Sequence, residues 1–150
     1  MKAFAVVCAV CRGFAVFPAG CVRSALRGKP VADVDISTKI LPKRVLEIAG
    51  VAGLKAIPTG IEHGTITVVS GGVPYEITTL RKDVATDGRR AVVEFSDRWE
   101  DDARRRDFRL NALYTEFHGK IHDPTGGLAD LPDRGSVFLG DARQGIRADF

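Results

Sequence analysis

Asp33-Val34-Asp35-Ile36 combines two acids with two β-branched residues. Its β-branched residues Val34 and Ile36 predict a strand over residues 33–36, with both of them facing a core. Because successive side chains of a strand alternate between its faces, Asp33 and Asp35 are expected to share the other face. Two adjacent carboxylates repel each other unless a cation lies between them, and Mg²⁺ prefers such hard oxygen ligands. A polar strand edge or a turn is the alternative.

The residues before this strand predict a phosphate-binding turn. A strand over residues 15–17 leads to Gly20, which opens a turn, and residues 21–26 predict a helix that Gly28 closes. Free backbone N–H groups and the positive end of the dipole make the start of such a helix suitable for a phosphate. Arg23, in the first turn, adds a charged guanidinium. A purely structural turn is the alternative.

Residues 65–81 predict a β-hairpin with Gly71-Gly72 as its two-residue turn. Counting outward from the turn, the expected pairs are Ser70 with Val73, Val68 with Tyr75, Thr67 with Glu76, Ile66 with Ile77, and Thr65 with Thr78. One face is apolar and the other is polar, and Glu76 is the only acid on the polar face. Glu76 is therefore a candidate third carboxylate beside Asp33 and Asp35, with a surface cross-strand pair as the alternative.

Local patterns predict several further elements. Residues 41–49 predict an amphipathic helix that Gly50 and Gly53 end. Its apolar face is expected to hold Leu41, Val45, Ile48 and Ala52. Residues 82–91 are polar and charged and predict a mobile loop, and residues 91–95 predict a short strand.

An arginine run closes the next predicted helix, which Ser96 is expected to cap and which runs through Trp99 and Ala103. Cations are favourable at the end of a helix, so the dipole alone explains residues 104–106. A clamp on the triphosphate and ribose of a nucleotide is the other interpretation.

The composition is that of one globular domain, with 150 residues and a net charge of +3. Basic residues concentrate between residues 81 and 106, among them Arg81, Lys82, Arg89, Arg90, Arg104, Arg105 and Arg106. This concentration suits a polyanionic partner, and a solvated basic face is the alternative. No run reaches the ~18 apolar residues that a membrane-spanning helix needs, so no membrane partner is expected.

The three cysteines, Cys8, Cys11 and Cys21, cannot form a disulfide framework, and no histidine has a zinc-site spacing with them. Buried, reduced thiols are expected, which fits a reducing cytoplasm. The apolar start of the chain is similar to a signal peptide, but Arg12 interrupts it, so export is not expected.

Two later stretches, taken with residues 20–35, resemble one known family. They are R-R-R-D-F-R-L-N-A-L-Y at residues 104–114 and D-P-T-G-G-L-A-D-L at residues 123–131. In this order they resemble the head domain of the class II tRNA nucleotidyltransferases, which comprise the CCA-adding enzymes and the bacterial poly(A) polymerases. The R-R-D-F-x-x-N-A-L pattern is highly specific, and the resemblance runs from about residue 16 to about residue 140.

The resemblance implies an α/β fold related to the polymerase β family, with a mixed, mostly antiparallel sheet flanked by helices. It implies transfer of CMP and AMP from CTP and ATP to the 3′ end of tRNA. Asp33 and Asp35 would hold two Mg²⁺ ions, and Glu76, in an E-x-T-T-x-R motif, would support the ion on the side of the 3′ hydroxyl. Poly(A) addition to RNA is the alternative within the same family.

The resemblance also assigns the nucleotide contacts. Gly20 and Arg23 would hold the triphosphate, and Arg106 would contact the nucleotide. Asp107 is expected to cap the next helix, and Asn111, one turn further on, would hold the motif together. The stretch at residues 123–131 is expected to be structural.

The sequence departs from the family pattern at three places. Ala19 and Ser24 stand where the turn motif has glycine and aspartate, and Arg109 stands where threonine is usual, so that a bulky cation would crowd or repolarise the site. Residues 1–14 are uncertain, residues 15–140 form the expected head, and residues 141–150 resemble the start of a neck that is cut off. The chain is then a fragment or a truncated copy, and an inactive remnant that only binds nucleotide or RNA is the other alternative.

Overall fold

The computed structural model contains both strands and helices. The residues that it describes are 15–30, 34–86, 91–116, 118–131, 137 and 139. Within them, seven strands form one sheet: β1 (Ala15–Pro18), β2 (Asp35–Thr38), β3 (Lys55–Gly60), β4 (Thr65–Ser70), β5 (Val73–Thr79), β8 (Tyr114–Glu116) and β9 (Ile121–His122). Two more strands, β6 (Arg81–Thr86) and β7 (Ala91–Phe95), pair as a separate hairpin.

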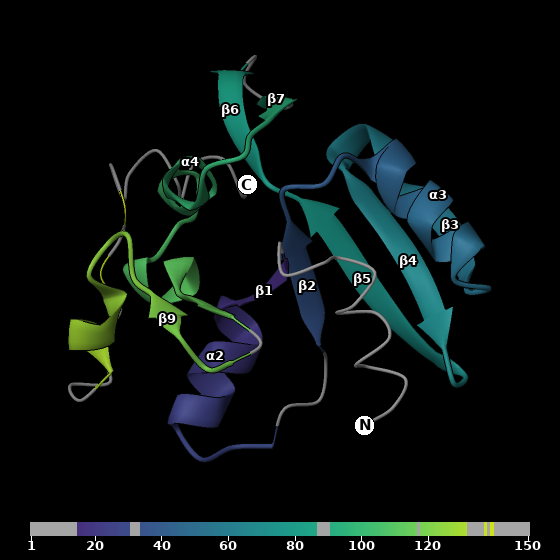
Figure 1. Ribbon diagram of the computed structural model, residues 1–150. Coiled ribbons are helices and arrows are strands. Elements are labelled where there is room, and N and C mark those ends of the chain that lie inside the picture. The colour runs from purple at the N-terminus through teal and green to yellow at the C-terminus, as the bar shows by residue number, and fades with distance from the viewer. Residues whose placement is uncertain are drawn as a thin grey trace.

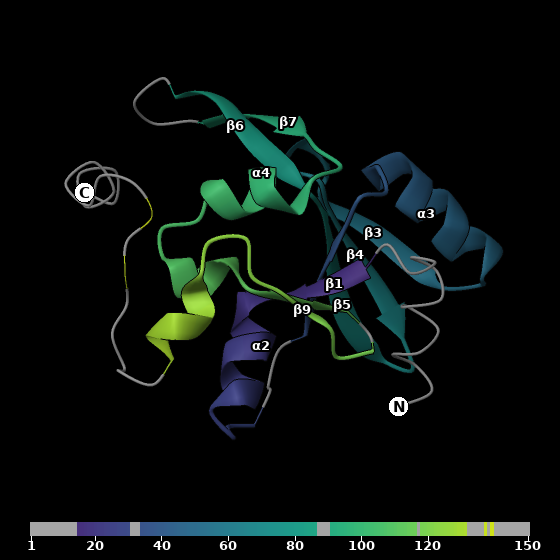
Figure 2. The ribbon, with the colours of Figure 1, turned by 60° about the vertical axis from the view of Figure 1, so that its left-hand side comes forward.

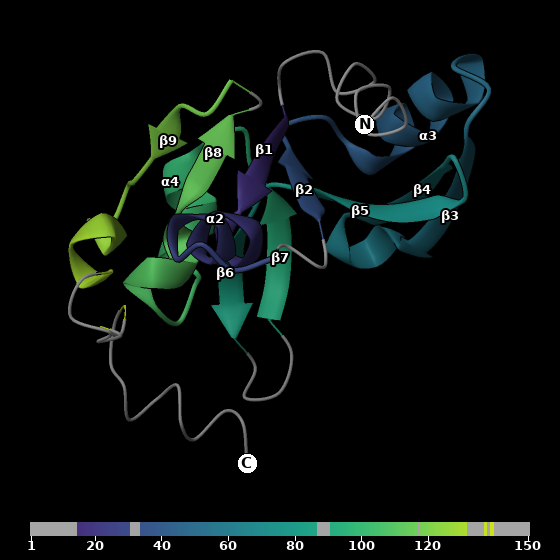
Figure 3. The same cartoon turned by 90° about the horizontal axis from the view of Figure 1, so that it is seen from below.

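The large sheet has the strand order β3-β4-β5-β2-β1-β8-β9. β2 and β5 run parallel, and the other neighbouring pairs of the described sheet run antiparallel. This arrangement confirms the predicted mixed, mostly antiparallel sheet. Seen from below, β8 and β9 lie at one end of the sheet and β3 and β4 at the other, with β1 and β2 between them (Figure 3).

Helices pack at both ends of this sheet. α3 (Pro42–Val51) contacts β3 and β4, and α2 (Ala19–Leu26) contacts β1 and β8 on the opposite side of β2 (Figure 1). α4 (Trp99–Arg104) contacts β6, whose hairpin projects beyond it (Figure 2). Three short 3₁₀ turns complete the described elements: η1 (Ile61–His63), η2 (Arg109–Ala112) and η3 (Gly127–Asp130). None of the helices in this described part is long and apolar enough to cross a membrane.

The β4–β5 hairpin has the register that the sequence predicts. Ser70 pairs with Val73 around the glycine turn, and the pairing continues to Thr65 with Thr78. Gly71 and Gly72 have φ angles of 60° and 80°, as a two-residue hairpin turn requires. The predicted apolar face is buried in the main core, where it consists of Ile66, Val68, Tyr75 and Ile77. Alternation of side chains therefore determined both faces of this hairpin.

The predicted boundaries at the start of the described chain are wrong. α2 begins at Ala19, directly after β1, so Gly20 lies inside the first turn of a helix and opens no separate turn. The helix ends as predicted, because Gly28 adopts a φ of 64° just beyond it. β2 begins at Asp35, where its pairing with β5 begins, and not at residue 33. Asp33 lies outside the described residues, as do Cys8 and Cys11.

The buried face of α3 also differs from the prediction. Leu41 was expected on the apolar face, but it is the N-cap residue and its exposed fraction is 54%. The helix begins at Pro42, whose fixed φ and missing N–H suit the first helical position. The residues that the helix buries are Pro42, Val45 and Ala49. Of the predicted face, Val45 alone is fully buried, and Ala52 is exposed.

Two predictions on the segment after the hairpin are wrong. Residues 82–86 continue as β6, because they pair with β7 despite their polar composition, so pairing overrides the local pattern. The remainder of the predicted loop, residues 87–90, lies outside the described residues. Arg98, and not Ser96, occupies the N-cap of α4. The Ser96 hydroxyl instead donates to Asp101 at 2.7 Å and accepts the backbone N–H of Arg98 at 3.1 Å.

Candidate active site

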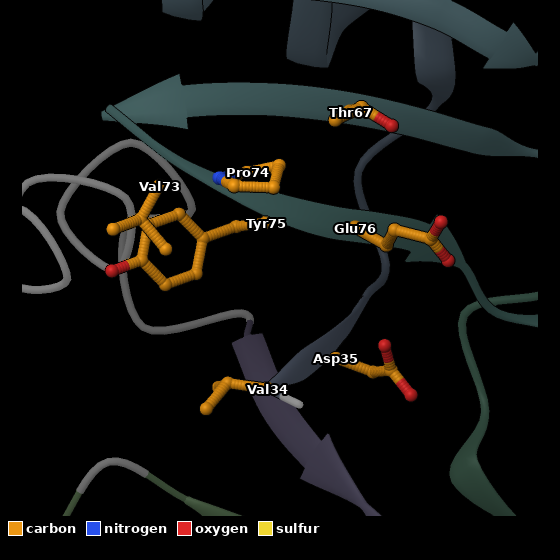
Figure 4. Close-up of a pocket in the computed structure, with 7 residues that line it drawn as sticks. All are labelled: Val34, Asp35, Thr67, Val73, Pro74, Tyr75 and Glu76. Carbon is orange, nitrogen blue, oxygen red and sulfur yellow. The ribbon is translucent and has the colours of Figure 1, made fainter. Parts of the chain in front are cut away.

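Asp35 and Glu76 are direct neighbours on the two parallel strands of the sheet. Asp35 of β2 pairs in register with Glu76 of β5, and both side chains are exposed. Their carboxylates extend in the same direction from adjacent strands (Figure 4). The structure therefore brings together two of the three predicted catalytic carboxylates, and it does not describe the third, Asp33.

Buried residues hold this carboxylate pair in place. Ile36 and Ile77, one residue further along each strand, are also register partners, and both are almost fully buried in the main core. Because side chains alternate along a strand, burial of the isoleucines directs Asp35 and Glu76 to the other face. A register slip of one residue would bury a carboxylate, so the core determines the position of both acids.

A pocket of about 570 Å³ adjoins the carboxylate pair. Its lining combines the two acids and one hydroxyl with apolar groups: Val34, Asp35, Thr67, Val73, Pro74, Tyr75 and Glu76 (Figure 4). β5 extends beyond the start of β2 on this side, because β2 begins only at Asp35. The pocket therefore lies beside the first residue of β2, at the edge of β5.

The start of α2 adjoins the start of β2 from the other side. β1 pairs antiparallel with β2 through Val16 and Ser37, and continuing this register places Pro18 opposite Asp35. Ala19 and Gly20 follow at once as the first residues of α2, whose first turn contains no acid. Their backbone N–H groups have no partner within the helix, so this end of α2 is suited to an anion. The side chain of Arg23 lies outside what the structure describes.

The buried carboxylate of Asp102 binds two of the three arginines at residues 104–106. Asp102 is 2% exposed, and its carboxylate accepts from Arg105 Nε at 2.8 Å, from Arg106 Nη2 at 3.0 Å and from the Tyr114 hydroxyl at 2.7 Å. The backbone N–H of Arg81 points at the same group from 3.4 Å. Asp102 thus links α4 to β6 and β8, and it fixes two of the arginines that the sequence assigned to a helix end or a nucleotide clamp.

The charges around Asp102 set its protonation. Burial on its own would raise the pKa of Asp102, but the guanidinium groups of Arg106 and Arg105, with the Tyr114 hydroxyl, outweigh it and lower that pKa below the ordinary 3.8. Burial and the neighbouring carboxylate raise the pKa of Tyr114, so its hydroxyl remains a donor. Burial opposes the charge of Arg106, but Asp102 outweighs this and raises its pKa. Asp102 is therefore ionised and Arg106 is charged at neutral pH.

The remaining residues of the predicted nucleotide site lie in and before η2. Phe108, and not Asp107, is the N-cap of η2, and Asp107 is exposed. The carbonyl of Asp107 accepts the backbone N–H of Leu139 at 2.7 Å. Asn111 lies within η2, half-buried, and its backbone N–H donates to Phe108 at 2.9 Å. η2 contacts α2, which connects this motif to the helix beside Asp35.

Arg109 joins η2 to the stretch at residues 123–131. Its Nη2 donates to the carbonyl of Gly126 at 2.8 Å and to Asp130 at 3.0 Å. Asp123 accepts the backbone N–H groups of Gly127 and Leu128 at 2.7 and 3.0 Å, which satisfies the start of η3. The expectation that Arg109 crowds the site is wrong, because its side chain is engaged by η3. The contacts of Asp123 and Asp130 confirm the structural role predicted for this stretch.

Gly127 lies too close to η2 to accept any side chain. A Cβ there would meet the carbonyl oxygen of Arg109 at 2.3 Å, which is backbone and cannot move aside cheaply. We expect Gly127→Ala to lower the free energy of unfolding by about 1–3 kcal/mol. Gly50→Ala is the matched control, since a Cβ on this exposed residue of α3 meets nothing within 4 Å. It should raise stability by ~0.5–1 kcal/mol. Chemical denaturation measures the free energy of unfolding of both variants. Equal changes in the two would show that the close approach of Gly127 to Arg109 does not affect stability.

Asp102 and Tyr114 are the residues of this region that sequence reasoning did not single out. The spacing of Asp102 from Arg105 and Arg106, three and four residues, is the ion-pair spacing of a helix and was a usable signal. Nothing local connects Tyr114 to them, because it lies on β8. Among the described residues, no three His, Cys, Asp or Glu side chains gather as a metal site. The two carboxylates of Asp35 and Glu76 are nevertheless hard oxygen donors side by side, and this donor set fits Mg²⁺.

The sequence matches a known protein family and is similar to individual known proteins. Residues 15–135 match the family model of the poly A polymerase head domain. A protein of Mus musculus named CCA tRNA nucleotidyltransferase 1, mitochondrial, is 42% identical over 132 residues, which cover 87% of this chain and 30% of that protein.

Solved structures resemble the whole described fold. The CCA-adding enzyme of Bacillus stearothermophilus, in complex with CTP, superposes with a TM-score of 0.81 at 34% identity, over 99% of this chain and 36% of that one. A tRNA nucleotidyltransferase complexed with a primer tRNA and an incoming ATP analog gives 0.66 at 29% identity, over 89% of this chain and 40% of that one. The chain thus spans about a third of the length of the relatives that it matches.

Proposed function

Because the chain belongs to the family of the poly A polymerase head domain, which CCA-adding enzymes share, we propose that it is the head of a tRNA nucleotidyltransferase. It transfers CMP and AMP from CTP and ATP to the 3′ end of tRNA. The observation that carries the proposal is the register of Asp35 with Glu76, which sets two carboxylates side by side on a rigid sheet. The fold and the family are those of nucleotidyltransferases, while the reaction of this shorter chain is our proposal.

The carboxylates hold the divalent ions in this proposal. Asp35 and Glu76 supply oxygen ligands from adjacent strands, and Asp33 adds the third. Mg²⁺ held by these carboxylates would lower the pKa of the attacking 3′ hydroxyl and offset the charge of the departing pyrophosphate. The rigid strands keep the carboxylates at a fixed spacing, so little reorganisation is needed when the substrates bind.

The nucleotide occupies the other side of Asp35. The free N–H groups at Gly20 and the guanidinium of Arg23 hold the triphosphate at the start of α2. Arg106 contacts the nucleotide, and Asn111 and Asp107 hold the η2 segment around it. The support is that Asp102 fixes Arg106 by a 3.0 Å ion pair while leaving 26% of its side chain exposed. Its Nε is buried and has no protein partner, so it can donate to a ligand only if the side chain shifts.

Poly(A) addition to RNA 3′ ends is the second candidate, and the family description favours it. Both reactions transfer a nucleotide to an RNA 3′ hydroxyl and need the same carboxylates. The two differ in which nucleotides are added and to which RNA. Cytoplasmic action is part of our proposal, and localisation of a tagged chain tests it against the mitochondrial location in the name of the mouse relative.

Incorporation of labelled CTP and ATP into tRNA that lacks its CCA end, with Mg²⁺, tests the proposal. Ordered addition of C, C and A by this chain supports CCA addition, and a run of A alone supports poly(A) addition. If the chain is inactive by itself, a neck-and-body piece of a complete relative is added in trans. Activity that appears only then identifies a fragment, and no activity together with no CTP binding contradicts the proposal.

A further inference from the structure

Three oxygen-bearing side chains form a row across β2, β5 and β4. Asp35 is the register partner of Glu76, and Glu76 is the register partner of Thr67. Because register partners lie on the same face of a sheet, Thr67 extends the carboxylate row by one strand, as Figure 4 shows. All three side chains line the same pocket.

The Thr67 hydroxyl has a fixed partner. It lies 2.8 Å from the hydroxyl of Thr59 on β3, at the exposed surface. One of these two O–H groups donates to the other, so the pair keeps one O–H and several lone pairs available to a ligand. A rigid hydroxyl pair beside two carboxylates favours a ligand that carries hydroxyl donors.

The rest of the pocket has the character of a sugar or base site. Val34, Val73, Pro74 and Tyr75 provide apolar surface next to the polar row. Apolar surface with a few placed hydrogen-bonding groups is typical of small-ligand sites. A ribose, with a neutral ring and hydroxyl donors, meets both requirements.

Strand order separates this pocket from the groups assigned to the incoming nucleotide. β5 and β4 lie on one side of β2, and β1, α2 and η2 lie on the other (Figure 1). Gly20, Arg106 and Asn111 all belong to the α2 and α4–η2 side. Asp35 stands between the two groups, so the β4–β5 side is left for the second substrate.

We propose that the pocket beside Asp35 and Glu76 receives the terminal ribose of the RNA acceptor, and that Thr67 contacts its 2′-hydroxyl. Thr67 is then a specificity residue that distinguishes an RNA end from a DNA end. This inference rests on the proposed function, because it takes the acceptor to be an RNA 3′ end. It adds to that function the residue that distinguishes ribose from deoxyribose.

Binding of two matched oligonucleotides tests the proposal without requiring activity. Both are the same short RNA ending in two cytidines, and one carries 2′-deoxycytidine as its last residue, so phosphate contacts cancel. Fluorescence anisotropy with Mg²⁺ gives the ratio of the two Kd values for the full chain. We expect the wild type to prefer the ribose end by about threefold to tenfold, the worth of one hydrogen bond. In Thr67→Val the ratio should fall to about one.

Thr78→Val is the matched control. Thr78, on β5, forms the same kind of hydroxyl pair with Thr65 of β4 at 3.1 Å, but it does not line the pocket. Valine suits a strand, so both variants should fold, and thermal unfolding checks this. Thr78→Val should keep the preference of the wild type.

Each outcome of these binding measurements either supports or overturns the inference. A wild type without ribose preference, or a Thr67→Val variant that keeps it, overturns the inference, while CTP and ATP incorporation would still support the proposed function. Loss of preference in both variants shows that the effect is not specific to the pocket and also overturns it. Failure to bind RNA and CTP alike contradicts the proposed function as well.

Discussion

Replacing Asp35 by Asn is expected to lower the incorporation of CMP into tRNA by on the order of a hundredfold to a thousandfold. Asparagine has the shape of aspartate but lacks its charge, so a divalent ion loses a charged ligand while the strand keeps its packing. Asp35 is exposed, and its neighbour Ile36 remains buried, so the fold should not change. The initial rate with labelled CTP, with the neck-and-body piece in trans where needed, measures the effect.

Asp83→Asn is the matched control for this prediction. Asp83 is also an exposed strand aspartate, but it lies on β6 and not on the sheet of Asp35. Its substitution should leave the rate within about twofold of the wild type, as is usual for surface changes. Glu76→Gln should also reduce the rate. An Asp35→Asn variant as active as Asp83→Asn would show that the carboxylate pair is not the catalytic site.

Replacing Asp102 by Ala should have the largest effect on stability. The change leaves Arg105, Arg106 and the Tyr114 hydroxyl around a site with no acceptor, and breaking a buried ion pair in this way costs about 3–5 kcal/mol. Arg105 and Arg106 are 15% and 26% exposed, so water partly compensates them and we expect about 3 kcal/mol. Urea denaturation at neutral pH measures the loss.

Asp101→Ala is the control for this substitution. Asp101 is the adjacent acid of the same helix, and its hydrogen bond to Ser96 is half-buried, so its loss should cost about 1 kcal/mol. Tyr114→Phe removes one of the hydrogen bonds to Asp102 and should also cost about 1 kcal/mol. If Asp102→Ala costs no more than Asp101→Ala, Asp102 does not organise the arginines.

The pKa of Asp102 gives this effect a defined pH dependence. Its folded pKa lies below the ordinary 3.8, so its ionised form stabilises the fold at every pH above that value. The contribution is lost as the pH falls below 3.8 and through the folded pKa. The gap in unfolding free energy between the wild type and Asp102→Asn should therefore be constant near neutral pH and shrink in acid. A gap that is unchanged in acid would contradict the role of the charge.

Local sequence patterns were sufficient to predict the elements whose conformation depends mainly on neighbouring residues. Alternation and the Gly71-Gly72 turn predicted the register of the β4–β5 hairpin, because a two-residue turn leaves one register in which an apolar face is buried. The same counting identified Glu76 as the lone acid of the polar face. Gly28 likewise marked the end of α2, since a positive φ there favours glycine.

Long-range pairing decided what these patterns left open. The polar residues 82–86 form β6 only because β7 supplies hydrogen-bonding partners. Nothing in the local pattern showed that Asp102, which holds Arg106, also accepts a hydrogen bond from Tyr114 of β8. Arg109 was expected to disturb the site, but contacts with Gly126 and Asp130 direct it to η3. In each case the deciding partner lies on another element, where local periodicity carries no information.

The candidate site shows the same division between sequence and structure. The sequence by itself determined that Asp35 and Glu76 are acids on the polar faces of two strands, because alternation with Ile36 and Ile77 requires it. Only the tertiary structure decided that these strands are parallel neighbours and that the two acids share a register position. That choice depends on burying both isoleucines in one core, and burial is a property of the whole chain that no local pattern encodes.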